Sequence, residues 1–403
     1  MSQAQAIDDR PELVCFSHLR WDFVYQRPQH LLSRAARSHR VFFIEEPIFK
    51  REGTPHLDIS SRPEGVTVIV PVLLEGTDAE LAEAQTRNLI GAHLQANLSG
   101  SPVLWYYTPM AVAFSRDIKA SAVIYDNMDE LSGFLGAPPR LLALEEELFA
   151  RADLVFTGGM SLYAAKRSRH PHVHAFPSSI DAAHFRKARA LKDADAPQDQ
   201  AVIARPRIGF FGVIDERMDV ELVREAAELR PDWQFVIIGP VVKINQATLP
   251  SAPNIHWLGP KSYAELPRYL TGWDAGFMPF AINDATRFIS PTKTPEFLAA
   301  GVPVVSTPIT DVVKPYGEKG LVEIARTPAE LVSALEHLLI RPREPWLGEV
   351  DQHLQTMSWD KTWAAMHGLI DQVKRRSSRP LSVSPPTNLS AGRAAAMKGN
   401  SYV

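Results

Sequence analysis

Lys293 and Glu296 stand three residues apart in the stretch "SPTKTPEFLAAGVPVVST", where polar residues lead into an apolar run of small residues. The pattern predicts a helix with Thr294 as its N-cap residue. Backbone N–H groups at such a helix start favour anions. Lys293 can neutralise a phosphate, and Glu296 can accept hydrogen bonds from two neighbouring hydroxyls, as on a ribose. The stretch therefore predicts a binding site for a ligand that carries a diphosphate and a diol.

The same stretch also fits a purely structural interpretation. Gly301 is expected to end the helix in a left-handed conformation before "VPVVST" re-enters a sheet. In that interpretation Thr294 caps the helix, and Glu296 only complements the positive end of the helix dipole. The residues of this stretch alone leave both interpretations open.

A second group of polar residues lies in the first half of the chain. His18, Arg27 and Gln29 in "HLRWDFVYQRPQH" are expected where the first strand ends and the first helix begins. Arg27 beside a helix start suits an anionic group, either a donor phosphate or an acceptor phosphate. Asp126 and Asp129 in "YDNMDE" follow a strand and could position an acceptor hydroxyl, whereas Asp126 could equally cap the next helix.

Two further patterns favour structural roles. Trp21, Phe23 and Tyr25 alternate, which is more typical of packing than of sugar stacking. The string "HPHVH" (170–174) resembles a metal-binding pattern but has no cysteine pair or acidic partner nearby, so we expect surface histidines and predict no metal site.

Length and composition limit the elements that can position these residues. The chain has 403 residues, of which 45% are hydrophobic and 22% are charged, so we expect a globular protein of two domains. The net charge of −3 does not favour nucleic acid as a partner. Cys15, the single cysteine, excludes an internal disulfide. Without a signal-peptide pattern or an apolar run of membrane-spanning length, the sequence predicts a cytoplasmic protein.

Short β-rich runs alternate with longer amphipathic stretches, which favours parallel α/β units. Strands are predicted at residues 13–17, 40–46, 66–72, 102–107, 122–126 and 153–157, and again at 207–212, 235–240, 255–258, 275–279, 302–306 and 321–324. Helices are predicted from Pro28 and at residues 79–98, 140–151 and 219–229. Two doubly wound halves, each opening with a strand, a loop, a helix and a strand, are the expected α/β architecture.

Composition also predicts the domain limits. The polar stretch "KARALKDADAPQDQAVIAR" without period indicates a connector, and an apolar stripe from Trp359 to Val373 indicates a helix packed across the body. We expect a first domain at residues 1–190, a linker at 191–206, a second domain at 207–345, a returning helix at 346–376 and a disordered tail at 377–403.

"SPTKTPEFLAAGVPVVST" resembles the signature of the retaining GT-B glycosyltransferases (group 1, family 4-like), in which a glutamate precedes an "A-x-G-x-P-V-V" run. "NIHWLGPKSYAELPRYLTGWDAGFMPF", "ADLVFTGGMSLY" and "FPSSIDAAHF" resemble other segments of that family. "WDFVYQRPQHLLSRAA" and "VIYDNMDELSGF" are similar to a bacterial subgroup of polysaccharide and cell-wall polymer biosynthesis. The resemblance implies two Rossmann-like domains that face a central cleft, with the donor on the second and the acceptor on the first.

The resemblance also implies roles for single residues. Lys293 and Arg217, the latter in "GVIDERMD", would be the catalytic cations that neutralise the leaving diphosphate, although Arg217 alone could be an exposed arginine at a helix entry. Gly212 would let the backbone approach the ligand. The implied donor-binding residues are Gly212, Gly259, Tyr263, Thr286, Thr294 and Glu296, and the acceptor-side residues are His18, Arg27, Gln29 and Asp126.

This sequence departs from the family pattern at two positions. Val213 stands where an arginine often follows the glycine, and Phe288 stands where a second glutamate usually touches the donor sugar. Contact with the sugar is then expected from backbone amides or from Asn283, Asp284 and Thr286.

The expected activity is therefore metal-independent transfer, with retention of configuration, from a UDP- or GDP-linked sugar to a glycan or lipid-linked acceptor. The nucleotide sugar is a substrate, and no cofactor is expected. A lipid-linked acceptor would bring the protein to the inner face of the membrane. Two alternatives remain: a sugar-nucleotide epimerase or hydrolase of the same fold, and a catalytically silent sugar-nucleotide-binding protein.

Overall fold

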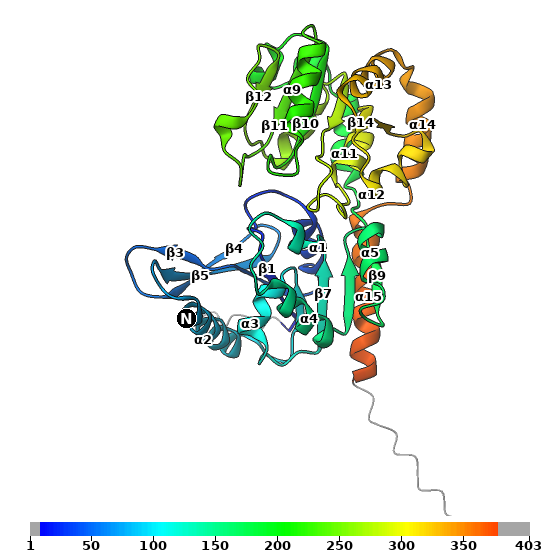
Figure 1. The fold of residues 1–403 in the computed structure, drawn as a ribbon. Helices are drawn as coiled ribbons and strands as arrows, with labels where there is room; N and C mark the ends of the chain where they lie inside the picture. The colour runs from blue at the N-terminus through cyan, green and yellow to red at the C-terminus, as the bar shows by residue number, and fades with distance from the viewer. Residues whose placement is uncertain (1–8, 378–403) are drawn as a thin grey trace, which may run out of the picture.

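A computed structural model describes residues 9–377 and shows two α/β bodies, one above the other (Figure 1). Within this range one sheet has nine strands and the other has six, and nearly all neighbouring strands are parallel. The predicted pair of doubly wound α/β domains is thereby confirmed. All predicted strands are present, and their ends lie within two residues of the predicted limits.

The first sheet has the strand order β3-β5-β2-β1-β6-β7-β8-β9, with β4 antiparallel to β5. Its strands are β1 (Glu12–Ser17), β2 (Arg40–Glu45), β3 (Ile48–Lys50), β4 (His56–Ser61), β5 (Val66–Leu74), β6 (Val103–Tyr106), β7 (Ala122–Asn127), β8 (Leu154–Thr157) and β9 (Val173–Ala175). The central strands are covered on both faces, which explains their continuous apolar runs. Strands β3, β4 and β9 were not predicted, because these edge strands of mixed polarity lack a continuous apolar run.

The second sheet has the strand order β12-β11-β10-β13-β14-β15 and is parallel throughout. Its strands are β10 (Arg207–Phe211), β11 (Gln234–Ile238), β12 (Ile255–Trp257), β13 (Ala275–Met278), β14 (Val304–Ser306) and β15 (Glu323–Ile324). The direction of winding reverses between β10 and β13, and open α/β sheets bind ligands at such a switch point.

Helices cover both faces of each sheet. The helices are α1 (Arg27–Ala35), α2 (Ala79–Asn97), α3 (Val112–Ser115), α4 (Leu141–Arg151), α5 (Met160–Lys166), α6 (Ala182–Phe185), α7 (Lys187–Ala190), α8 (Gln198–Ala201), α9 (Val220–Leu229), α10 (Leu266–Leu270), α11 (Lys293–Ala300), α12 (Thr310–Val313), α13 (Pro328–Ile340), α14 (Arg343–Leu354) and α15 (Trp359–Ser377). On the first sheet, α1 and α15 share one core and α2 and α4 share the other. On the second sheet, α9 and α13 pack on one face and α10, α11 and α14 on the other.

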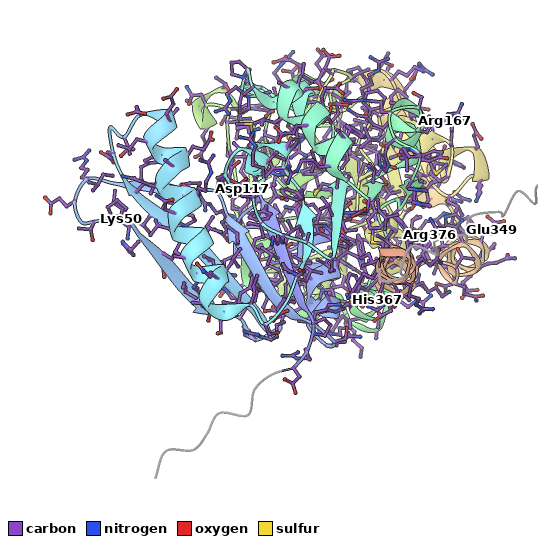
Figure 2. All side chains as sticks on the ribbon, turned by 90° about the horizontal axis from the view of Figure 1, so that it is seen from below. Lys50, Asp117, Arg167, Glu349, His367 and Arg376 are labelled. Atoms are coloured by element: carbon purple, nitrogen blue, oxygen red, sulfur yellow. The ribbon has the colours of Figure 1, made fainter. Side chains whose placement is uncertain are left out.

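Helix α15 returns from the second body to the first. Trp359, Trp363, Met366 and Ile370 are buried in the core beside α1, and α15 runs along the lower body in Figure 1 although α14 lies on the upper one. Seen from below, His367 on α15 and Lys50 on β3 lie at opposite sides of the molecule (Figure 2). The apolar stripe seen in the sequence therefore forms a helix that ties the end of the described chain to the first sheet.

The segment 191–206, expected as a polar connector, is folded against the second body. It contains α8, and the Gln200 side chain donates to the Tyr269 carbonyl (2.8 Å) and accepts from the Trp273 indole N–H (2.7 Å). Of the expected tail, only Ser377 is described, as the last residue of α15. Residues 378–403 lie outside the described range.

Candidate active site

Two cavities open between the two bodies, and both contain residues from each. The first cavity, of about 90 Å³, is lined by Gln26, Arg27, Met128, Asp129, Gly158 and Ser178 of the first body and by Phe210, Val213, Arg217, Met218, Pro279, Phe280 and the segment 289–293 of the second. The second cavity, of about 310 Å³, is lined by residues 21–25 and Glu64 of the first body and by Phe211, Gly212, Ile238, Gly239, Pro240, the segment 260–263 and Leu266 of the second. The loops that follow β10 and β13 thus reach the cleft at the switch point between these two strands.

Helix α11 begins two residues before the position expected from the sequence. Thr292 is its N-cap and Lys293 its first residue, so the prediction of Thr294 as the N-cap was wrong. The Thr294 side chain is instead buried, with its hydroxyl 3.6 Å from the Met278 sulfur. Pro295 fits the third helical position, because the first four N–H groups of a helix have no acceptor within it. Gly301 ends the helix with φ 78°, as predicted.

Lys293 lines the first cavity, and Glu296 lies three residues further along α11. Glu296 is buried and Lys293 half-buried, and within residues 9–377 neither forms a hydrogen bond or an ion pair. Burial lowers the pKa of the Lys293 ammonium, and the Arg217 guanidinium lowers it further. Burial raises the pKa of the Glu296 carboxyl, and the positive charge of Lys293 offsets part of this rise. Charged groups removed from water need partners, so this pair is suited to a ligand that supplies them.

Arg217 is a fixed cation of the cleft and not an exposed arginine. Its Nε and Nη2 atoms donate to the Asp215 carboxylate at 2.9 and 2.6 Å. Its guanidinium lies 5.4 Å from the centre of the Phe134 ring, which belongs to the first body. Among the described residues Nη1 has no hydrogen-bond partner. Asp215 therefore orients Arg217 and leaves one edge of the guanidinium available to an anion.

Asp129 faces these cations from the first body. It lines the same cavity as Arg217 and Lys293, and within residues 9–377 its carboxylate has no hydrogen bond or ion pair. Burial raises the pKa of the Asp129 carboxyl, although Arg217 and Arg27 lower it. Of the two aspartates that the sequence singled out, Asp129 is the one left open to a ligand.

Asp126 instead forms a buried ion pair with Arg27. The Arg27 Nη2 atom lies 2.8 Å from Asp126 Oδ1, with 3% and 0% of the two side chains exposed. Arg27 also donates to the Phe176 carbonyl at 2.7 Å. Asp126 lies in β7 and caps no helix, so neither role considered from the sequence describes it. A carboxylate buried inside a sheet requires a countercharge, and Arg27 supplies it.

The Gln29 side chain is engaged in hydrogen bonds within the protein, whereas His18 has a ring nitrogen without a partner. Gln29 accepts from the backbone N–H of Gln26 (3.0 Å) and donates to the Trp21 carbonyl (2.7 Å), so its side chain fixes the start of α1. His18 has a buried Nδ1 atom without a partner. Burial lowers the pKa of His18 to about 4, which keeps its ring neutral near pH 7. Of the four predicted acceptor-side residues, His18 has a buried ring nitrogen without a partner, and Arg27 lines the first cavity.

Three glycines end neighbouring strands of the second sheet. Gly212, Gly239 and Gly259 follow β10, β11 and β12 with φ values of 142°, 149° and 69°. A Cβ atom on Gly212 would lie 1.9 Å from Lys293 Cε, and one on Gly239 would lie 1.8 Å from the Gly212 carbonyl oxygen. Gly212 thus leaves the space that the Lys293 side chain occupies. The sequence analysis missed Gly239, although its place after the strand "FVII" was a usable signal.

Comparison with protein families identifies the second body. Residues 205–341 match the family described as "Glycosyl transferases group 1". The matched part, from just before β10 to just after α13, is similar to that family. TuaH of Bacillus subtilis (strain 168), named as a glycosyltransferase of teichuronic acid biosynthesis, is 27% identical to this chain over 277 residues, or 64% of this chain and 68% of TuaH.

Solved structures resemble the whole described fold. A sucrose-phosphate synthase from Thermosynechococcus elongatus superposes with a TM-score of 0.68 at 13% identity, covering 91% of this chain and 100% of that one. An alpha,alpha-trehalose-phosphate synthase (UDP-forming) from Burkholderia xenovorans, in complex with glucose-6-phosphate, gives a TM-score of 0.65 at 12% identity, covering 89% and 100%. The two α/β bodies with their shared cleft are a GT-B fold.

Within this GT-B fold, Tyr263 lies at the boundary between the domains. Its ring stacks on Tyr25 at 4.5 Å and on His184 at 4.2 Å. Its hydroxyl is buried without a partner. Burial raises the pKa of Tyr263, and the nearby Glu296 carboxylate adds to the rise. Tyr25 therefore packs across the domain boundary, in agreement with the preference for packing over sugar stacking.

Thr286 and Phe288 lie in the loop after β13, and Val213, the other position that departs from the family pattern, lies in the loop after β10. The Thr286 hydroxyl donates to the Ala281 carbonyl (2.5 Å) and accepts from the Asn283 N–H (3.1 Å), so it stabilises the turn. Phe288 packs under the Arg287 guanidinium at 5.0 Å, and Val213 lines the first cavity. Thr286 would have to give up these bonds to bind a donor sugar.

Within residues 9–377, no group of three or more His, Cys, Asp or Glu side chains is arranged to hold a metal ion. The helices in the same range include none that is long and apolar enough to cross a membrane.

Proposed function

We propose that the protein transfers a glycosyl group, with retention of configuration, from a nucleoside diphosphate sugar to an acceptor hydroxyl. The observation that carries the proposal is the partnerless pair Lys293 and Glu296 at the start of α11, beside Gly212. A ligand with a diphosphate and a ribose would satisfy both groups at once. The similarity to the group 1 family supports the same conclusion.

The donor is proposed to lie along the carboxyl ends of the second sheet. The diphosphate would occupy the first cavity against Lys293, Arg217 and the N-terminus of α11, where helix N–H groups add a favourable field. The ribose would bond to Glu296. The base would extend into the second cavity, over the ends of β10 and β11.

Retention requires the acceptor to approach the face of the sugar from which the diphosphate leaves. Asp129, Arg217 and Lys293 line one cavity, so an acceptor hydroxyl held by Asp129 would lie on the side of the leaving group. The bond between the anomeric carbon and the donor oxygen breaks, a bond to the acceptor oxygen forms, and the hydroxyl proton passes to the departing diphosphate. Lys293 and Arg217 would stabilise the charge that grows on that diphosphate.

We also propose that the reaction needs no divalent cation, because Arg217 and Lys293 can neutralise a diphosphate between them. Turnover would then be unchanged by EDTA and by added Mg²⁺. A strict requirement for Mg²⁺ would contradict this part of the proposal.

The acceptor is proposed to be a growing glycan or a lipid-linked sugar of a cell-envelope polymer, used in the cytoplasm at the inner face of the membrane. The likeness to TuaH supports the envelope polymer. A UDP- or GDP-linked sugar remains the proposed donor, used as a substrate without a further cofactor.

Incubation with radiolabelled UDP-, GDP- and ADP-sugars, with and without a bacterial lipid extract, tests the proposal. A labelled glycan or lipid, with the donor's anomeric configuration preserved by NMR, is the expected product, and Lys293→Ala should abolish most of it. Isomerised or hydrolysed nucleotide sugar without transfer would favour an epimerase or hydrolase. Binding without any turnover would favour the silent binding protein.

A further inference from the structure

Glu64 carries a carboxylate without a partner on the first-domain side of the second cavity. It lies in the turn between β4 and β5 and lines the cavity opposite Gly212 and Gly239. Its Oε2 atom is shielded from water and has no hydrogen-bond partner. Within residues 9–377 neither oxygen forms a hydrogen bond or an ion pair. A shielded carboxylate oxygen without a donor is costly, so its position in a ligand-sized cavity calls for a donor from a ligand.

The other charged side chains of this cavity already have partners. Asp22 pairs with Arg62 at 2.6 Å, and Lys261 pairs with Asp199 at 2.7 Å. Glu64 therefore differs from both: it is the charged residue of the described cavity wall whose hydrogen-bonding capacity is unused.

On the facing wall, the Tyr263 hydroxyl is a buried donor without a partner among the described residues, and the remaining side chains offer few free donors. Pro240 and Pro260 line this wall and have no backbone N–H. The Ser262 hydroxyl is engaged with Glu265 at 2.6 Å. A base that enters this cavity consequently meets one strong acceptor, Glu64, and would be selected by the N–H groups that it can offer to it.

We propose that Glu64 recognises the Watson–Crick edge of guanine, so that the donor is a GDP-linked sugar. This inference rests on the proposed function and specifies its substrate. Guanine presents its N1–H and N2–H groups side by side, at a spacing that matches the two oxygens of one carboxylate. Such charge-assisted, paired hydrogen bonds are among the strongest in proteins.

Other bases fit this carboxylate less well. Uracil offers one N–H between two carbonyl oxygens, and those oxygens would face the Glu64 oxygens without a proton between them. Adenine places an acceptor nitrogen beside its amino group, with the same result. A base that leaves a buried acceptor unpaired loses far more affinity than one that merely lacks a contact. Glu64 would thus select against UDP and ADP as well as for GDP.

Calorimetric titration of the full chain with GDP, IDP, UDP and ADP tests the proposal. GDP should bind roughly 10- to 100-fold more tightly than UDP or ADP, in the range that a paired base contact provides. IDP, which lacks the 2-amino group, should bind with intermediate affinity. Glu64→Gln should weaken GDP binding by a similar factor and strengthen UDP binding, because the amide N–H replaces one acceptor and can donate to a uracil carbonyl oxygen.

Asp58→Asn is the matched control, since Asp58 is exposed on β4 of the same hairpin and lies outside the cavity lining. It should leave all four affinities unchanged. Tighter binding of UDP or ADP than of GDP, or a GDP affinity that Glu64→Gln does not alter, would overturn the guanine assignment and leave the proposed function standing. Failure of all four nucleotides to bind would contradict the proposed function itself.

Discussion

At the scale of single residues, Lys293 and Glu296 determine how the protein would bind its donor. They lie one helical turn apart, and Lys293 reaches past Gly212 toward the cleft. Without a ligand each is held away from water with no hydrogen bond, a costly arrangement for charged groups. A bound diphosphate and ribose would supply the missing hydrogen bonds. We therefore expect these two residues to contribute to ligand binding and not to the stability of the fold.

Lys293→Ala should reduce turnover by about 100- to 1,000-fold, the usual effect of losing one donor to a developing oxyanion. The fold should persist, because Lys293 makes no hydrogen bond within the described chain. Initial rates of glycosyl transfer and circular dichroism check both statements. Lys50→Ala, at an exposed position of β3 (Figure 2), is the control and should have normal rates. Equal rates for the two variants would remove Lys293 from the mechanism.

Nucleotide-sugar affinity should depend on pH with a maximum between two limbs. Because the pKa of Glu296 is raised, its carboxylate is lost as pH falls, earlier than for an ordinary glutamate. Because the pKa of Lys293 is lowered, its charge is lost as pH rises, earlier than for an ordinary lysine. Titrations between about pH 5 and pH 10 should show both limbs. Lys293→Arg should extend the alkaline limb, because a guanidinium stays charged; a flat profile would contradict the pairing.

At the scale of elements, the sequence predicted the buried strands and the C-terminal end of α11 well, but it misplaced the start of α11 and did not predict side-chain pairing. Buried strands such as β10 carry continuous apolar runs, and Gly301 marks the end of α11 through its left-handed conformation. The Arg27–Asp126 pair joins α1 to β7 across 99 positions of sequence, and no local sequence pattern predicts it. Asp129 could be preferred over Asp126 only once that pair was visible.

Asp126→Ala should lower the free energy of unfolding by about 3–5 kcal/mol, since it leaves the buried Arg27 guanidinium without its countercharge. Glu75→Ala removes the exposed ion pair with Arg51, in which 88% of the Arg51 and 54% of the Glu75 side chain is exposed, and should cost less than about 1 kcal/mol. Urea denaturation followed by tryptophan fluorescence gives both values. Similar small losses for the two variants would show that the buried pair is dispensable.

Gly212→Ala should weaken nucleoside diphosphate binding by roughly 10- to 100-fold, the range for a lost hydrogen bond to a charged group. The added Cβ would meet Lys293 Cε at 1.9 Å and displace the ammonium. Gly53→Ala has a comparably wide positive φ of 116° and no neighbour within 4 Å, so it controls for backbone strain. Calorimetry on both variants separates backbone strain from displacement of the Lys293 ammonium. An unaltered affinity for Gly212→Ala would contradict the proposed position of Lys293 beside Gly212.

At the scale of the whole molecule, the two domains meet through contacts that close the cleft. Asp311 of the second domain accepts from the Ser161 N–H of the first at 3.0 Å, and Tyr25 stacks on Tyr263. These contacts join segments far apart in the sequence, which is why periodicity and composition predicted two domains but not how they face each other. Closure brings Asp129 and Glu64 of the first domain to a donor held on the second.

The most direct test is a crystal structure of the protein with a bound nucleotide sugar. We predict diphosphate oxygens within hydrogen-bonding distance of Lys293 Nζ and ribose hydroxyls on the Glu296 carboxylate. A nucleotide bound elsewhere, or a cleft left without ligand at saturating concentration, would contradict that prediction.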